Sequence, residues 1–240
     1  MSVKQSSGIL AIWHDMVLEQ EQALNDWYNK EHHAERVALE GFFSARRHIA
    51  LEATPKFFVF YETTDPSVLE TPAYLDCVNN PSSWTQRCMP HYRNTNRLVC
   101  SRTAYLGLGH GAAVMTLRFA AGDAGGGAAL KRAQAALAEP GMVSAQIWQL
   151  DPRRTHLPSQ EKEIRAKSED TMDGSADWTI MLTANLPDQV KAASRKHFDG
   201  AELQRDGIAD GAPETGLYRL IFTLGAEQWK RERFCRISAV

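Results

Sequence analysis

The sequence lacks the features that mark several large classes of protein. Its four cysteines form no C-x-x-C pair, a usage that suits the reducing cytoplasm. No stretch of 18 apolar residues occurs, and the apolar run near the N-terminus is too short for a signal peptide. Lysines and arginines number 27 against 29 aspartates and glutamates, which indicates no nucleic-acid partner. We therefore expect a soluble, globular, cytoplasmic protein with no membrane partner.

Motifs of several familiar chemistries are also missing. The chain has no P-loop, nucleophile elbow or dinucleotide-binding fingerprint, and the glycines at 107–111 and 122–127 belong to plain loops. Glu31, His32 and Glu35 have spacings that metal ligands on a helix can use, but no H-E-x-x-H or E-x-x-H pair and no cysteine accompanies them. We predict no metal and no cofactor. A haem held by a histidine is left as an alternative that no sequence rule supports.

What the sequence does contain is a regular alternation of strand and helix patterns. A period-2 apolar run over 8–16 predicts a strand, and apolar residues three and four apart over 20–39 predict a helix that Gly41 ends. For the first half we predict strands at 8–16, 42–51, 57–63 and 97–106, helices at 20–39 and 65–79, and an irregular stretch at 81–97. For the second half we predict strands at 112–121, 142–150, 177–186 and 217–224 and helices at 128–138 and 187–203.

Both halves thus share the order β-α-β-β-α-β. A local echo supports a duplication, because L-E-G-F-F-S-A at 39–45 is matched by A-E-P-G-M-V-S-A at 138–145. We predict an α+β fold of two ferredoxin-like repeats, residues 8–106 and 107–227, each a four-stranded antiparallel sheet with two helices on one face. Since an isolated sheet would leave its second face wet, we expect the two repeats to pack sheet against sheet.

The second repeat carries a polar insert at 151–176 where the first has a tight turn. The insert has no apolar period, and loop-length statistics favour a solvated extension of the hairpin. A lid over a pocket or over a partner subunit is the alternative interpretation.

Chemistry-bearing residues are concentrated in the first repeat, above all in W-Y-N-K-E-H-H-A-E-R over 27–36. On an ideal helix, Glu31 and Glu35 fall inside the apolar sector, His32 at its edge and His33 on the opposite, solvated face. Two carboxylates on a buried stripe need partners or a wet pocket. Ion pairs with Arg46, Arg47 or Arg97 would satisfy Glu35, whereas Glu31 with His32 favours a pocket.

The strands add further polar groups to the first repeat. His14 shares a strand face with Leu10, Ile12 and Met16, where a satisfied core histidine is the simpler interpretation. The next two predicted strands carry Arg46, Arg47 and His48, then Tyr61 and Glu62. Arginine, histidine and tyrosine together suit a weakly acidic substrate, by binding its anion, moving its proton and orienting it.

A run of motifs through the first repeat resembles a known family. W-Y-N-x-E-H-x-x-E-R at 27–36 is followed by G-F-x-x-A-R-R at 41–47, P-K-F-F-V-F-Y-E at 55–62, P-A-Y-L at 72–75 and P-x-x-W-T-x-R-x-x-P at 81–90. These residues resemble the EthD-like branch of the dimeric α+β barrel superfamily over about 8–105. The resemblance implies that two ferredoxin-like units pair through their sheets, here within one chain, and that pockets lie between sheet and helices. The superfamily includes cofactor-free monooxygenases, isomerases, cyclases and haem enzymes, so fold alone does not define the reaction.

The second repeat has no counterpart of W-Y-N-x-E-H, so we expect one pocket per chain. We predict a cofactor-independent isomerase or lyase that acts by acid/base chemistry on a small, aromatic or lactone-like organic acid. A non-catalytic small-ligand-binding or stress-associated module is the rival, and a homodimer is left open. The predicted catalytic residues are His32, Glu31 and His14, and the predicted substrate-binding residues are Trp27, Tyr28, Arg36, Arg47, Tyr61 and Trp84.

Overall fold

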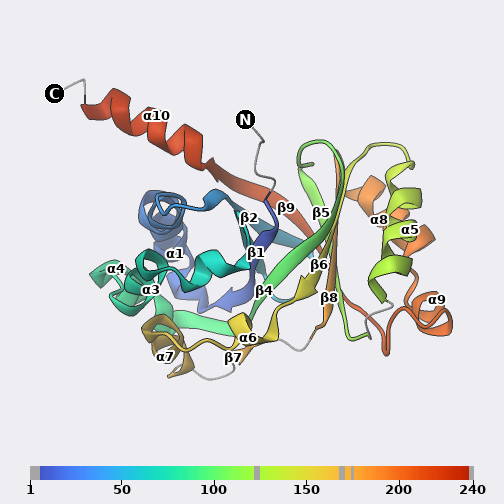
Figure 1. Ribbon diagram of the computed structural model, residues 1–240, viewed down its shortest axis with the longest axis horizontal. Coiled ribbons are helices and arrows are strands. Elements are labelled where there is room, and N and C mark those ends of the chain that lie inside the picture. The colour runs from blue at the N-terminus through green and yellow to red at the C-terminus, as the bar shows by residue number, and fades with distance from the viewer. Residues whose placement is uncertain (1–5, 122–124, 168–170, 174–175, 238–240) are drawn as a thin grey trace.

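Eight antiparallel strands close into one barrel in the computed structural model, which describes residues 6–121, 125–167, 171–173 and 176–237 (Figure 1). The first half contributes the order β4-β1-β3-β2 and the second half β9-β5-β8-β6. These strands are β1 Gly8–Met16, β2 Phe42–Glu52, β3 Phe57–Thr63, β4 Tyr92–Gly107, β5 Ala113–Phe119, β6 Met142–Leu150, β8 Trp178–Ala184 and β9 Glu214–Gly225. The predicted α+β fold of paired ferredoxin-like repeats is confirmed.

The last strand of each half joins the two halves. Strand β4 pairs with β1 over Tyr92–Ser101 and then with β6 over Cys100–Gly107. Strand β9 pairs with β5 over Glu214–Arg219 and with β2 over Leu217–Gly225. Because both seams are continuous hydrogen-bonded ladders, the barrel has no free edge between the halves. The predicted division at 106/107 stays a prediction; β4 ends there, and five residues precede β5.

Helices cover the barrel on two opposite sides (Figure 1). One side carries the helices of the first half, and the other carries α5, α8 and α9 of the second half. The α-helices are α1 Glu21–Trp27, α2 His33–Val37, α3 Pro72–Asn79, α4 Ser83–Cys88, α5 Gly125–Leu137, α6 Pro152–Thr155, α7 Gln160–Ala166, α8 Pro187–His197, α9 Gly200–Arg205 and α10 Ala226–Ile237. Shorter elements are the 3-10 helices Leu18–Gln20, Pro66–Glu70 and Met89–His91, the π turn Tyr28–His32, and strand β7 Thr171–Asp173, parallel to β4.

Strand alternation divides the side chains between the barrel interior and the helix layers. On β1, Ile9, Ala11 and Trp13 face the interior, where they pack with aromatic side chains of the other strands. Leu10 and Met16 face the helices of the first half. His14, of the same parity, is fully buried on that face.

Two predictions about the first half need correction. The helix predicted at 65–79 is two pieces, because Pro72 disfavours helical backbone at Thr71, whose hydroxyl instead caps α3. The stretch predicted as irregular at 81–97 contains α4, which the hydroxyl of Ser82 caps, and β4 already begins at Tyr92. The helix caps at Thr71 and Ser82 are local sequence signals, and a search for apolar periodicity does not detect them.

The second half differs from prediction near its end. The helix predicted at 187–203 is divided into α8 and α9, and Asp199 caps the second piece. Helix α10 follows β9 with no predicted counterpart and projects away from the barrel (Figure 1). The loop expected at 122–127 falls partly outside the described residues, and α5 already begins at Gly125. Within the described ranges, no helix is both long and apolar enough to span a bilayer.

Candidate active site

The helix that carries W-Y-N-K-E-H-H-A-E-R contains a π turn. Residues 21–37 are helical without interruption, but Tyr28–His32 adopt π geometry between α1 and α2. A π turn inserts one residue relative to an α-helix and therefore rotates everything after it by about 100°. On an ideal helix Glu31 and Glu35 would lie on the buried face. Here His32 and Arg36 occupy those positions, and they are 4% and 2% exposed.

This rotation corrects the prediction that Glu31 and Glu35 occupy the buried stripe. Glu31 turns toward α4, where its Oε1 accepts a hydrogen bond from Ser82 Oγ at 2.5 Å. Glu35 is partly exposed, at 3.7 Å from His32 Nδ1. His33, expected in solvent, is fully buried: its ring stacks on Phe222 of β9 with centroids 4.9 Å apart, and its Nδ1 lies 3.1 Å from Tyr61 Oη.

Below this helix lies a polar cavity against the outer face of the first-half sheet. It contains about 380 Å³ of empty space, mouth included. The strands supply Tyr61, Tyr92 and Arg97, and the π turn and α2 supply Tyr28, His32 and Arg36. The remaining lining residues are Leu10, Ile12, Tyr74, Met89, Glu161 and Arg165.

The insert after β6 covers this cavity. Its helix α7 contributes Glu161 and Arg165, which are four residues apart and so share one helix face. Contacts that hold the insert against the first half include Arg154 Nε to Glu70 Oε2 at 2.6 Å, the backbone N–H of Gln160 to Asn79 Oδ1 at 3.1 Å, and Arg36 Nη2 to Glu161 Oε1 at 2.5 Å. The described part of the insert is therefore an ordered cover, and the lid interpretation fits it better than the solvated extension.

Positive charge dominates the lining. Arg36, Arg97 and Arg165 are each at most 8% exposed, and Glu161 is the only carboxylate among the lining residues. Burial alone would lower the pKa of Arg36, but the carboxylate of Glu161 raises it above its usual value, so Arg36 is charged. Three buried cations beside one anion favour binding of an organic anion.

The histidines near the cavity are neutral bases. Burial lowers the pKa of His32 well below its usual value, with the charge of Arg36 acting in the same direction. Burial likewise lowers the pKa of His14 to about 3 and raises the pKa of Tyr28 to about 12. His32 Nδ1 is buried without a hydrogen-bond partner, which is unusual for a polar atom in a protein interior. An unprotonated imidazole beside arginines is equipped to accept a proton from a bound acid.

The structure brings together four of the predicted site residues: Tyr28, His32, Arg36 and Tyr61 all line the cavity. The other five do not line it. His14 stacks on Tyr92 with centroids 4.3 Å apart and lies 3.4 Å from Tyr28 Oη, which places it behind the tyrosines. Trp27 stacks on His32 at 4.1 Å.

The remaining three predicted residues point elsewhere. Glu31 binds Ser82, as described above, and Trp84 packs on the edge of the first-half apolar core. Arg47 hydrogen-bonds Asn25 and lies over the Tyr28 and Phe57 rings at 4.7 and 4.9 Å. Arg47 is not among the residues that line the cavity.

Sequence reasoning missed Tyr74, Tyr92, Arg97, Glu161 and Arg165 as lining residues, although Arg97 was considered as an ion-pair partner of Glu35. Tyr74 stands in the P-A-Y-L motif, so a signal was present there. Glu161 and Arg165 had only their i,i+4 spacing within a polar segment, and nothing in the sequence indicates that this segment folds back onto the first half.

The histidine rings near the cavity are enclosed by aromatic rings: His14 packs on Tyr92, His32 on Trp27 and His33 on Phe222, with centroids 4.1 to 4.9 Å apart. Among the residues that the structure describes, no three histidine, cysteine or carboxylate side chains are grouped as metal ligands. The predicted absence of cofactor and metal stays a prediction.

Comparison with solved structures supports the barrel fold. No model of a known protein family and no curated protein sequence matches the chain. An anthrone oxidase-like protein superposes with a TM-score of 0.60 at 14% identity, over 94% of each chain. A proposed monooxygenase from Fusobacterium nucleatum superposes with a TM-score of 0.55 at 12% identity, over 92% of this chain and 95% of the other. A proposed chlorite dismutase superposes with a TM-score of 0.54 at 9% identity, over 91% of this chain and 96% of the other. This chain therefore has the dimeric α+β barrel fold, with both units in one polypeptide.

Proposed function

We propose that the protein is a cofactor-independent enzyme that removes a proton from carbon in a small organic acid held in the cavity under α7. The observation that carries this proposal is the juxtaposition of three buried arginines with the neutral imidazole of His32, whose Nδ1 is buried without a hydrogen-bond partner. Arginines stabilise the negative charge that develops on an enolate or phenolate when the proton leaves. An isomerase or lyase returns the proton elsewhere or expels a leaving group.

The roles follow from position. Arg165 and Arg97 bind the substrate's carboxylate on the side of the insert, and Arg36 stabilises the developing enolate next to His32. His32 accepts the proton, and the ring of Trp27 holds its orientation through stacking at 4.1 Å. Tyr28 and Tyr61 have pKa values raised by burial, so they are protonated and act as hydrogen-bond donors. His14 is a positioning residue, because it touches Tyr28 and Tyr92 and does not line the cavity.

Substrate entry requires α7 to move. The two polar side chains that α7 contributes to the lining are almost entirely buried, with Glu161 at 9% and Arg165 at 7% exposed. The substrate's carbonyl oxygen, which becomes the enolate oxygen, would replace Glu161 beside Arg36 and keep the arginine paired while the helix opens. The Arg36–Glu161 pair is therefore the proposed latch of the lid.

A second candidate shares the first step. Structural neighbours are named as a monooxygenase and an anthrone oxidase-like protein. In that case the same carbanion would react with O₂ in place of being reprotonated. The EthD-like assignment from the motifs in the first repeat remains part of this proposal, and a purely ligand-binding module is the non-enzymatic rival.

The test follows deuterium incorporation at carbon by proton NMR in D₂O, with a panel of arylacetates, hydroxybenzoates, lactone acids and anthrone. We expect at least one compound to exchange in the presence of the wild-type protein. The variant His32→Gln should lower that rate by about 10²-fold or more, because general-base catalysis contributes at least that much. The control His156→Gln alters an exposed histidine and should leave the rate unchanged.

Three outcomes separate the candidates. Exchange that proceeds equally with and without air supports the isomerase or lyase, whereas oxygen consumption during turnover supports the oxygenase. Binding of a compound, seen as a rise in Tm, with no exchange and no conversion supports the binding module. Exchange that survives His32→Gln would contradict the proposed base.

We further propose that the protein works in the cytoplasm on a small-molecule substrate. The described cysteines Cys77, Cys88 and Cys100 are free thiols, which supports a reducing compartment. The homodimer left open by the sequence stays a prediction.

A further inference from the structure

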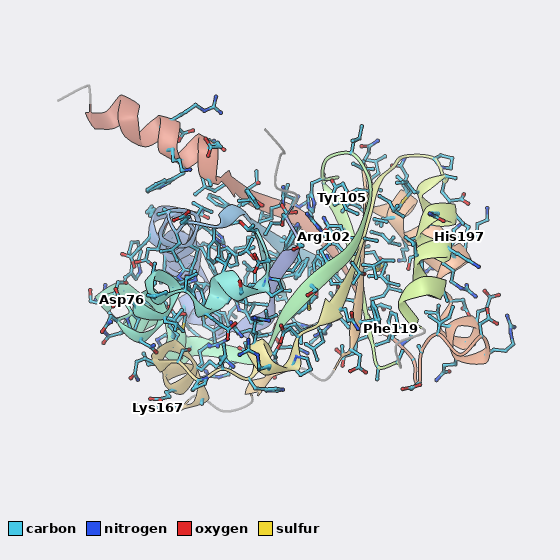
Figure 2. All side chains as sticks on the ribbon, in the orientation of Figure 1. Asp76, Arg102, Tyr105, Phe119, Lys167 and His197 are labelled. Atoms are coloured by element: carbon cyan, nitrogen blue, oxygen red, sulfur yellow. The ribbon has the colours of Figure 1, made fainter. Side chains whose placement is uncertain are left out.

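A second polar cavity lies at the end of the barrel where β5 stops and β8 and β9 start. It contains about 490 Å³ of empty space, mouth included. Phe119, labelled in Figure 2, lies at this end of the barrel, and Arg102 and Tyr105 lie toward the other end. The lining residues are Asn96, Arg118, Phe119, Ala120, Ala176, Gly211, Ala212 and Glu214. None of them belongs to the cavity under α7, which lies outside the barrel wall.

Arg118 is the one buried charge on this lining. It is 6% exposed, and its guanidinium lies over the indole of Trp13 at 4.4 Å. Its Nη2 donates to Glu214 Oε2 at 2.5 Å, but Nε and Nη1 are buried without any hydrogen-bond partner. Most buried arginine donors in proteins are paired, so two unpaired donors on one guanidinium call for an acceptor that the chain does not supply.

Neighbouring polar atoms are in the same condition. Asn96 Oδ1, Trp13 Nε1 and Thr179 Oγ1 are buried without partners. The strand registers bring these residues together, because Trp13 pairs with Asn96 across β1 and β4, and Arg118 pairs with Thr179 across β5 and β8. One barrel end thus collects unpaired polar atoms from four strands.

We infer that this cavity binds the carboxylate of a small aliphatic monocarboxylic acid. Arg118 supplies the charge, and its unpaired Nε–H and Nη1–H groups supply the donors for the carboxylate. Four of the other lining residues are alanine or glycine and one is Phe119, which suits a short apolar tail. Glu214 lies on the lining and already neutralises one side of Arg118, so a second full negative charge would be repelled and a dianion is disfavoured.

The experiment titrates butyrate into the wild-type protein and follows the Nε–Hε resonance of Arg118 by ¹⁵N NMR, assigned by its loss in Arg118→Lys. We expect a saturable shift with butyrate and none with butyramide, which has the same shape without the charge. Sulfate should bind more weakly than butyrate. Because the readout is the Arg118 resonance, acid binding in the cavity under α7 does not interfere, and Arg165→Gln should leave the titration unchanged.

Two variants test the assignment further. Arg118→Gln should weaken butyrate binding at least about tenfold, as expected for loss of a charged hydrogen bond. Glu214→Gln changes a side chain that is 70% exposed and should tighten binding about threefold, because it removes a competing carboxylate. The inference is overturned if butyrate gives no saturable shift, if butyramide matches it, if sulfate binds more tightly, or if Glu214→Gln leaves the affinity unchanged.

Discussion

The two helix layers of the molecule bury opposite kinds of surface. On the first half, the layer encloses tyrosines, histidines and arginines around a cavity. On the second half, α5 packs Ala129, Ala133 and Ala136 against Ile147 and Leu182, all at most 1% exposed, in a continuous apolar core to which α8 adds Val190 and Ala193. The same topology can therefore hold either a polar site or a dry core, and the side chains on the first helix of each half decide which.

The pH dependence of stability is expected to show this difference most strongly. Five histidines have pKa values lowered by burial, to about 3 for the fully buried His14 and the half-buried His110. The other three, all buried, are His32, His33 and His48. Below pH 6.5 the unfolded chain takes up protons that the folded chain refuses, so stability falls as the pH drops. Each histidine contributes about 1.4 kcal/mol per pH unit in that window.

Urea unfolding at pH 8, 6.5 and 5.5 measures this loss. His110→Gln should flatten the dependence, whereas His156→Gln, on the surface, should not. Amide exchange at low pH should rise in residues 21–37 before it rises in α5. Equal amide exchange in both helix layers at low pH would contradict the expected difference between the two halves.

The lid should be the next most sensitive feature. Glu161→Gln leaves Arg36 buried without its counter-charge, and we expect a loss of about 3 kcal/mol together with faster trypsin cleavage around α7. Glu163→Gln, on the exposed face of the same helix, is the matched control and should change neither. Unchanged cleavage in Glu161→Gln would show that the ion pair does not hold the insert.

The dry core should reject a polar group that the first half would accept. Ala133→Asn buries an amide with no partner among the apolar residues around it, at a cost of about 2 kcal/mol in unfolding free energy. Ala135→Asn on the same helix is exposed and should cost only its helix propensity, below about 0.7 kcal/mol. Equal losses in thermal unfolding would indicate that this core admits water.

The smallest effect is expected at Glu31. Its carboxylate faces Ser82 and not the cavity, so Glu31→Gln should change the deuterium-exchange rate by less than about twofold. The measurement is the NMR assay described for His32. A loss of tenfold or more would bring this carboxylate into the reaction.

Strand periodicity and the duplicated element order were enough to predict the barrel. Apolar residues at every second position indicate a strand from the local sequence alone, without knowledge of its tertiary contacts. The site could be predicted only in part. The π turn moved His32 and Arg36 into the positions that a regular helix assigns to Glu31 and Glu35, and no propensity rule places a π turn at Tyr28. Glu161 and Arg165 reach the site from more than a hundred residues away, through a fold-back that only tertiary structure reveals.

The shared strands β4 and β9 have a consequence for how the barrel assembles. Two separate ferredoxin-like chains must meet at a concentration set by their affinity, and a barrel formed that way falls apart on dilution. Here β4 carries the first half directly into its pairing with β6, and β9 returns the second half to β2. Closure is therefore an intramolecular event that proceeds at a fixed effective concentration. Each half that carries the cavity under α7 therefore has its supporting half in a fixed ratio, however scarce the protein is.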